Sequence, residues 1–281
     1  MNSTSISAKD TTALPNFLLI GAQKAGSSTL HDYICKHDQI YMPPAKELHY
    51  FDDGFFTKSI VSYRQNFLPS GGAIKIGEGT PSYLSYPGCA EKIRSLLGDI
   101  PLVVILRDPI SRMYSQYWHS VKFGRETLSF LEALKAEDAR RQELGMSFYR
   151  VFDYISRSSY ETHIRKYKAQ FSRLHVCRLE DLSGDPLGTL NGIYRFLGVS
   201  TVSEVIELPA SNSSKLARFQ FINHVLNAYE DRFGLNRVTG LIRRKNFYPY
   251  KYPKLSDSDR QFAIDRLHET CPDTVNTYGL R

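Results

Sequence analysis

Two glycines frame the segment of this sequence with the clearest chemistry. Gly21 and Gly26 have the G-x-x-x-x-G spacing of a loop that cradles a phosphate-like anion, and the loop follows an apolar run, residues 17–20. Nucleoside triphosphatases continue with Lys and then Ser or Thr after the second glycine. This chain continues instead with Ser27 and carries its lysine earlier, at Lys24. The spacing predicts an anion site unlike that of ATP hydrolases, and a ligand-free turn that merely needs small residues is the alternative.

An arginine follows the most hydrophobic run of the chain. Residues 101–106 form this run, Arg107 and Asp108 end it, and Ser115 comes two helical turns later. Ligands of open α/β sheets lie at the carboxyl ends of the strands. A planar guanidinium and a hydroxyl suit a terminal phosphate, so this pair predicts a second anion contact. An Arg–Asp pair that caps a helix is the alternative.

Short apolar runs alternate with helical patterns along the chain. The predicted strands cover residues 17–20, 74–78, 101–106 and 174–179. The predicted helices start near residue 27, cover 89–97, 110–121, 130–144 and 216–233, and follow Pro186. This alternation predicts an α/β fold with a central parallel sheet flanked by helices. We expect a single domain over residues 15–281 after a flexible tail over residues 1–14.

Composition and charge limit the class of protein. With 42% apolar and 23% charged residues in 281, the chain is globular and not disordered or a coiled coil. The net charge of +7 favours an anionic partner, but it does not distinguish a nucleotide from a nucleic acid or an acidic glycan. No apolar run approaches the roughly 18 residues of a membrane helix, so no membrane partner is expected.

The four cysteines indicate a reducing compartment. They lie far apart and include no C-x-x-C pair, which predicts neither a disulfide framework nor a zinc site. We therefore expect a cytoplasmic protein without a metal site.

Four motifs stand in order in the first half of the chain. They read PNFLLIGAQKAGSSTL (residues 15–30), KELHYF (46–51), GEGTPSY (77–83) and VILRDPISRMYS (104–115). Together they resemble the sulfotransferase family that uses 3′-phosphoadenosine 5′-phosphosulfate (PAPS), and the likeness extends to about residue 200. The heparan sulfate and bacterial carbohydrate branch is more similar than the cytosolic phenol and steroid enzymes. Ordered motifs in the right strand contexts are more specific than any single loop.

The resemblance implies a donor site and a catalytic base. The 5′-phosphosulfate loop of the family matches Lys24, Ala25, Gly26, Ser27, Ser28 and Thr29, and the pair that binds the 3′-phosphate matches Arg107 and Ser115. Lys24 would also stabilise charge in the transition state. The carboxylate before the Thr-Pro turn matches the general base and is Glu78. Gly79 follows it where the family often has Lys, which lowers the expectation of a polyanionic glycan acceptor.

Further candidates carry weaker signals. His119 lies one helical turn after Ser115 and is a candidate catalytic residue, with an ordinary half-buried histidine as the alternative. Ser159 and Tyr160 resemble the segment that contacts the nucleotide. In residues 46–51, Lys46 is the residue most expected to face the pocket, and the adjacent aromatic residues are expected to pack. The basic segment 237–254 is either a lid over the 3′-phosphate or a solvated surface.

The resemblance implies sulfuryl transfer from PAPS to a hydroxyl or amine of a saccharide or small-molecule natural product. The mechanism would be in-line displacement with Glu78 as base, PAP as product and no metal requirement. An ATP-using kinase with a P-loop is one alternative, which the position of Lys24 disfavours. A non-catalytic module that binds nucleotides or nucleic acids is the other, although a nucleic-acid partner is not expected.

Overall fold

The chain divides into two compact units in the computed structural model, which describes residues 14–52, 57–67, 71–206, 215–217, 222, 226, 239, 242 and 245–278. Unit 1 consists of Met1–Arg107 and Glu161–Pro209, and unit 2 consists of Asp108–Tyr160 and Ala210–Arg281. Each unit has an apolar core of its own.

A parallel sheet forms the centre of unit 1. Its strands are β1 (Phe17–Gly21), β2 (Ile40–Tyr41), β3 (Lys75–Gly79), β4 (Leu102–Leu106) and β5 (Leu174–Arg178). The strand order is β2-β3-β1-β4-β5, and every neighbouring pair is parallel. The predicted α/β class and parallel sheet are confirmed, and the four predicted strands all occur. The ends of β1, β3 and β4 therefore lie next to one another at one edge of the sheet.

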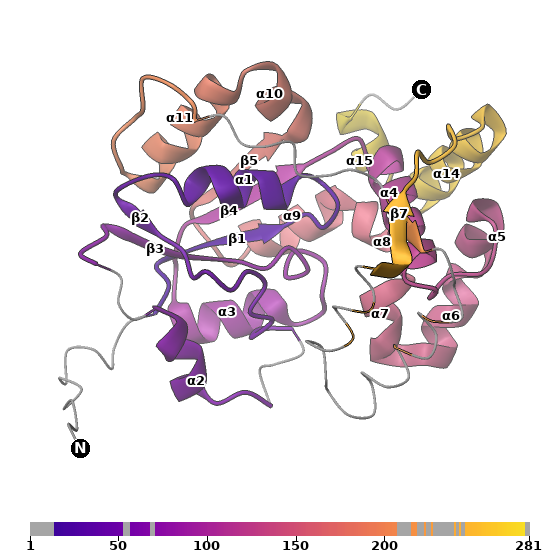
Figure 1. The fold of residues 1–281 in the computed structure, drawn as a ribbon, viewed down its shortest axis with the longest axis horizontal. Helices are drawn as coiled ribbons and strands as arrows, with labels where there is room; N and C mark the ends of the chain where they lie inside the picture. The colour runs from indigo at the N-terminus through magenta and orange to yellow at the C-terminus, as the bar shows by residue number, and fades with distance from the viewer. Residues whose placement is uncertain are drawn as a thin grey trace. The chain divides into compact units, whose positions relative to one another are not determined.

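Helices cover both faces of this sheet (Figure 1). The helices of unit 1 are α1 (Ser27–Ile34), α2 (Ile60–Arg64), η1 (Gln65–Phe67), α3 (Cys89–Leu97), α9 (Tyr160–Lys168, whose first residue belongs to unit 2), α10 (Leu179–Gly184) and α11 (Pro186–Leu197). Alternate strand residues such as Leu19 and Val103 pack against α1, α10 and α11. Helix α3 lies on the opposite side of the strands.

Unit 2 is mainly helical. Its elements are α4 (Pro109–Lys122), α5 (Phe130–Lys135), α6 (Glu137–Leu144), η2 (Gly145–Ser147), α7 (Phe148–Val151), α8 (Ile155–Ser158), α14 (Asp257–Thr270), α15 (Pro272–Thr277) and the antiparallel strands β6 (Lys215–Ala217) and β7 (Phe247–Pro249). The sequence begins α4 sharply, because Asp108 Oδ1 accepts a hydrogen bond from Ser111 N at 2.7 Å and Pro109 takes the first helical position.

Two predicted helices differ from the structure. Residues 130–144 form two helices, α5 and α6, that meet at Ala136, since the carboxylate of Glu137 turns inward to bind backbone amides of another segment. In the predicted helix 216–233, the first two residues instead pair with β7 as part of β6. Residues 222 and 226 are helical, and the rest of that range, like residues 1–13 of the predicted tail, lies outside the described residues.

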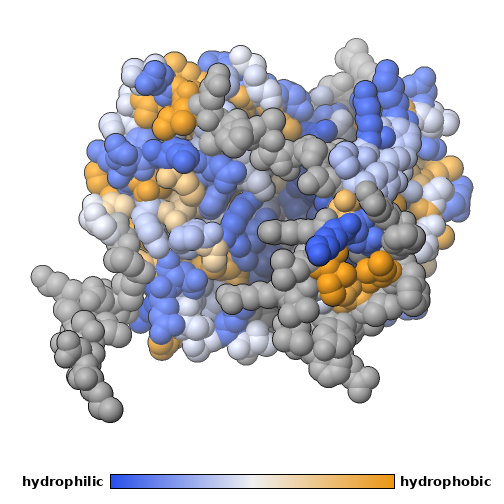
Figure 2. Space-filling view, in the orientation of Figure 1, coloured by the Kyte–Doolittle hydropathy of each residue, from blue (hydrophilic) through white to orange (hydrophobic). Residues whose placement is uncertain are grey.

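Hydrophilic residues cover most of the coloured surface in Figure 2, with apolar residues in separate groups. Within the described part of the chain, no helix combines the length and apolar character needed to cross a membrane.

Candidate active site

The loop after β1 has the tight backbone that its glycines predict. A Cβ on Gly21 would lie 2.6 Å from Leu84 Cβ, and one on Gly26 would lie 2.6 Å from Leu179 Cδ1. Gly26 also has a φ of +88°, in the left-handed region. Lys24 has a positive φ of 68° although it carries a side chain. Both glycines are therefore required by the fold around the loop.

The start of α1 offers backbone donors at this loop. The first helical hydrogen bond joins Leu30 N to Gly26 O at 3.0 Å, so the N–H groups of Ser27, Ser28 and Thr29 precede the helical ladder. Gly26, as the N-cap, supplies no side-chain acceptor for them. These donors and the positive end of the helix dipole suit an anion.

Arg107 lies against the same loop. Its Nη1 donates to Lys24 O at 3.5 Å, and β4, which it follows, is the neighbour of β1 in the sheet. The structure thus brings Arg107 together with Lys24 as the order of strands requires. Ser115 is half-buried on α4 in unit 2, so its pairing with Arg107 stays a prediction.

Glu78, the predicted general base, lies in β3 with its carboxylate enclosed. Its residue is 1% exposed, and its carboxylate accepts hydrogen bonds from Thr80 Oγ1 at 2.6 Å, Tyr83 OH at 2.7 Å and Tyr63 OH at 2.5 Å. Burial raises the pKa of Glu78 above its ordinary value and outweighs these three hydroxyls, which act in the opposite direction. The hydroxyls of its own and neighbouring segments thus enclose the carboxylate of Glu78, and its role as general base stays a prediction.

The segment 46–52 brings charged side chains to the loop instead. Lys46 Nζ donates to Ser28 Oγ at 2.5 Å and lies 3.6 Å from Glu47 Oε1. His49 Nε2 lies 3.7 Å from Glu47 Oε2, and His49 Nδ1 contacts Asp52 Oδ2 at 2.7 Å. The side chains of Glu47 and His49 are 35% and 38% exposed, whereas that of Asp52 is only 2% exposed. Lys46 therefore lies beside the anion loop, and a carboxylate–histidine–carboxylate series adjoins it.

Opposite charges in this series stabilise the charged forms of His49 and Glu47. Burial lowers the pKa of His49, but the hydrogen bonds and negative charges of Asp52 and Glu47 outweigh burial and raise it to about 9. Burial raises the pKa of Glu47, but His49 and Lys46 outweigh it and hold this pKa below its ordinary value. Glu47 is therefore an ionised, partly exposed carboxylate beside a protonated imidazole at neutral pH.

The remaining predicted residues lie in unit 2. His119 is half-buried on α4, with its ring 4.8 Å from that of Phe123. Ser159 is buried and donates from Oγ to Ile155 O at 3.2 Å, and the buried ring of Tyr160 lies 5.4 Å from that of Tyr278. Their roles toward a nucleotide or an acceptor stay predictions.

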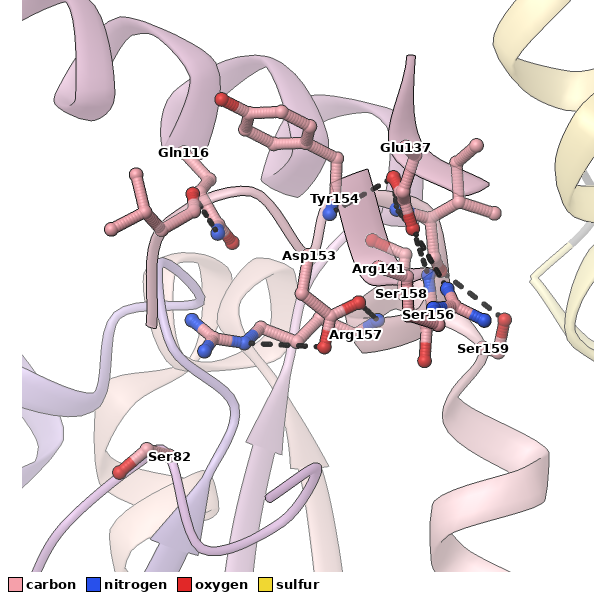
Figure 3. A network of polar contacts seen from close by, with 12 residues as sticks. Ser82, Gln116, Glu137, Arg141, Asp153, Tyr154, Ser156, Arg157, Ser158 and Ser159 are labelled. Atoms are coloured by element: carbon pink, nitrogen blue, oxygen red, sulfur yellow. Dashed lines mark hydrogen bonds and ion pairs between the residues drawn. The ribbon is translucent and has the colours of Figure 1, made fainter. Parts of the chain in front are cut away.

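A buried network fixes the segment before Ser159 (Figure 3). The Glu137 carboxylate accepts from the backbone N–H groups of Tyr154, Ile155 and Ser156 at 3.1, 2.9 and 3.2 Å. Fully buried Arg112 donates from Nε to Ser158 Oγ and from Nη2 to Tyr154 O, both at 2.6 Å. Arg112 therefore ties α4 to this segment.

Metal ligation has no candidate in the part of the chain that the structure describes. That part contains no group of three or more His, Cys, Asp or Glu side chains that could hold a metal ion. Of the basic segment 237–254, residues 239, 242 and 245–254 are described, and the others lie outside the described residues. Its role stays open.

Comparison with known families identifies the fold and the reaction class. The profile of the Sulfotransferase family matches residues 62–204, just over half of the chain. The chain belongs to the sulfotransferase family. This finding confirms the family that the motifs resemble.

Relatives of this sulfotransferase include larger proteins. The membrane-associated sulfotransferase kil1 of Dictyostelium discoideum is 35% identical over 119 residues, which cover 41% of this chain and 25% of that protein. Heparan sulfate glucosamine 3-O-sulfotransferase 3B1 of Mus musculus is 27% identical over 193 residues, which cover 67% of this chain and 47% of that protein. The chain thus spans between a quarter and about half of the length of these relatives. The match to the second relative supports the predicted similarity to the heparan sulfate branch of the family.

A solved structure has the same fold. The sulfotransferase from Alicyclobacillus acidocaldarius matches with a TM-score of 0.67 and 24% identity, and the match covers 95% of this chain and 100% of that one.

Sequence reasoning missed Glu47 and Asp52 as site residues of this sulfotransferase, and it gave His49 only as a weak candidate. The signal was present as three ionisable residues at i, i+2 and i+5 directly after Lys46. No strand or helix pattern covers that segment, and the structure confirms that residues 42–50 lie outside helices and strands. Periodicity therefore could not show which side chains point outward. The expected packing of Tyr50 and Phe51 is confirmed, since both are buried.

Proposed function

We propose that this sulfotransferase takes its sulfuryl group from PAPS and transfers it to a hydroxyl or amine of a saccharide or small-molecule natural product. One observation supports this most strongly: Lys46 contacts Ser28 of the anion loop at 2.5 Å and the outward carboxylate of Glu47 at 3.6 Å. An anion cradle, a cation and a candidate base therefore share one face of unit 1.

The loop fits the donor's phosphosulfate. Backbone N–H groups at Ser27, Ser28 and Thr29 would hold its oxygens, and Lys24 would supply a positive charge, while Arg107 would hold the 3′-phosphate together with Ser115. When bound, the donor supplies the sulfuryl group and leaves as PAP. Negative charge grows on the departing oxygen during transfer, so cations and fixed amides around it stabilise the transition state more than the ground state.

Glu47 is the general base that the geometry favours over Glu78. The acceptor must lose a proton as its bond to sulfur forms, and an ionised carboxylate within hydrogen-bond reach can take it. Glu47 is ionised, partly exposed and adjacent to the loop, and His49⁺ stabilises its charge, whereas Glu78 is enclosed. Asp52 in turn orients the His49 ring through Nδ1.

The relatives support a saccharide as the acceptor class. Proteins named for heparan sulfate sulfation match two thirds of this chain, which supports a saccharide acceptor. Gly79 provides no cation for such an acceptor, which keeps uncharged sugars and small metabolites in the proposal. A cytoplasmic location remains part of the proposal as well.

Titration calorimetry with the Arg107→Ala variant tests the donor assignment. The wild type should bind PAP and bind 5′-AMP more weakly. Loss of Arg107 should weaken the affinity for PAP by about 10- to 100-fold, which corresponds to a charge-assisted hydrogen bond of about 1.5–3 kcal/mol. It should change the affinity for 5′-AMP less than twofold. Equal losses for both ligands would remove Arg107 from the 3′-phosphate. Tight binding of Mg²⁺–ATP without PAP binding would favour a kinase instead.

A further inference from the structure

The carboxylate of Glu78, near the end of β3, accepts three side-chain hydrogen bonds. Its carboxylate is enclosed by three hydroxyl donors that come from β3's own turn and from α2. In its ionised form a carboxylate only accepts, so each of these hydroxyls points its single proton at Glu78. The direction of every hydrogen bond around it is thereby fixed.

The direction of the hydrogen bond from Tyr83 to Glu78 determines how Tyr83 binds the backbone of the segment that carries Glu47 and His49. Because the Tyr83 proton is committed to Glu78, the phenol oxygen can accept, and it accepts from Tyr50 N at 2.9 Å and Phe51 N at 3.3 Å. A buried carboxylate thus reaches two backbone amides of the neighbouring segment through one hydroxyl.

Two further contacts act on the same segment. Thr80 Oγ1 donates to Glu78 and accepts from His49 N at 3.5 Å. The ring of Tyr63, whose hydroxyl donates to Glu78, stacks on Tyr50 with centroids 4.1 Å apart and planes 14° apart. All three donors of Glu78 therefore contact residues 49–51.

The segment requires such support because its backbone is strained. Glu47 and His49 have φ values of 60° and 50°, in the left-handed region that is unfavourable for residues with a side chain. This conformation turns Glu47 and His49 outward while Asp52 stays buried against them. Without external hydrogen bonds, the segment would relax and the series of side chains would separate.

We infer that Glu78 is a positioning residue: through Tyr83, Thr80 and Tyr63 it holds residues 47–52 in the conformation that aligns Glu47, His49 and Asp52. The catalytic meaning of this alignment rests on the proposed function, whereas the alignment itself is a property of the free protein. Loss of the bridge should therefore disturb both turnover and the His49–Asp52 contact.

The Tyr83→Phe variant removes the bridging hydroxyl and keeps the ring. We expect kcat to fall roughly 10- to 100-fold, as for a misplaced catalytic group, with PAP affinity unchanged. Tyr167→Phe is the matched control, since Tyr167 is equally buried and donates to Tyr83 O at 2.7 Å without reaching residues 47–52. It should lose similar stability and keep kcat within twofold. A Tyr83→Phe variant as active as this control would overturn the inference.

NMR titration of His49 in the free protein gives a readout that does not need turnover. In wild type and Tyr167→Phe the pKa of His49 should be raised, and in Tyr83→Phe and Glu78→Gln it should move toward 6.5 as the contact with Asp52 loosens. An unchanged His49 pKa in Tyr83→Phe would contradict the positioning role. If these shifts occur but no PAPS-dependent transfer does, the positioning role stands and the proposed function fails.

Discussion

At the scale of residues, two glutamates of unit 1 have opposite environments. Glu47 is partly exposed, strained at φ 60° and paired with His49, whereas Glu78 is 1% exposed and bound by three hydroxyls. A general base must be accessible to the acceptor substrate, whereas a positioning residue can be fully enclosed. These environments agree with the proposed roles, general base for Glu47 and positioning residue for Glu78.

Substitution of each glutamate by glutamine separates these tasks. Glu47→Gln should reduce sulfuryl transfer by about 10²- to 10⁴-fold, because the proton acceptor is lost, and should leave PAP affinity within twofold. Transfer rates and calorimetry measure the two effects. Glu91→Gln, an exposed change on α3, serves as the control and should have no effect. Full transfer by Glu47→Gln together with complete loss in Glu78→Gln would return the role of base to Glu78.

The pH dependence of stability tests the His49–Asp52 pair. The folded pKa of His49 is about 9, above its ordinary 6.5, so the stabilisation by charged His49 is fully present below about pH 6.5. It is lost as pH rises through about 9. The effect is modest because 38% exposure of the side chain allows solvent screening. Urea unfolding at pH 6.5 and pH 9.5 should show a smaller loss in Asp52→Asn than in wild type, and equal losses would argue against the pair.

At the scale of elements, the loop between β1 and α1 depends on glycine for two separate reasons. Gly26 is left-handed, and a side chain there would also collide with Leu179. Gly198 ends α11 with a similar φ of +77° but has open space around it. The two positions share a left-handed backbone, but of the two only Gly26 faces a collision with a neighbouring side chain.

Alanine at each position measures that difference. Gly198→Ala should cost about 1–2 kcal/mol from backbone strain. Gly26→Ala should cost a further 1–3 kcal/mol or so from overpacking against Leu179, and it should also weaken PAP because the loop must shift. Urea unfolding and calorimetry test both statements. Equal costs at the two positions would mean that Leu179 moves aside freely.

Elements with strong periodicity could be predicted from the sequence, and the segment 46–52 could not. Apolar runs and glycine turns located β1, β3, β4, β5 and the anion loop, since buried strands and their turns depend on local residue types. The orientation of Glu47 and Glu78 depends on long-range hydrogen bonds from Tyr63 and Tyr83. A strand-end glutamate with a following threonine has the same local pattern whether it faces solvent or a ring of hydroxyls.

At the scale of the whole molecule, the chain combines a parallel-sheet unit and a mainly helical unit within the sulfotransferase family. The anion loop, Lys46, Glu47 and Arg107 belong to unit 1, and Ser115, His119, Ser159 and Tyr160 belong to unit 2. A ligand that binds only the folded protein stabilises it by mass action, so we expect PAP at 100 times its Kd to stabilise the protein by about 2.7 kcal/mol.

Transfer of sulfur-labelled PAPS is the measurement that tests the central claim most directly. Purified protein is incubated with the labelled donor, a chelator, and a panel of sugars, phenols and amines, with Glu47→Gln as the matched inactive variant. The account predicts label on at least one hydroxyl or amine acceptor, release of one PAP for each sulfate transferred, and no transfer by the variant. PAP binding without transfer to any acceptor, or no PAP binding at all, would contradict it.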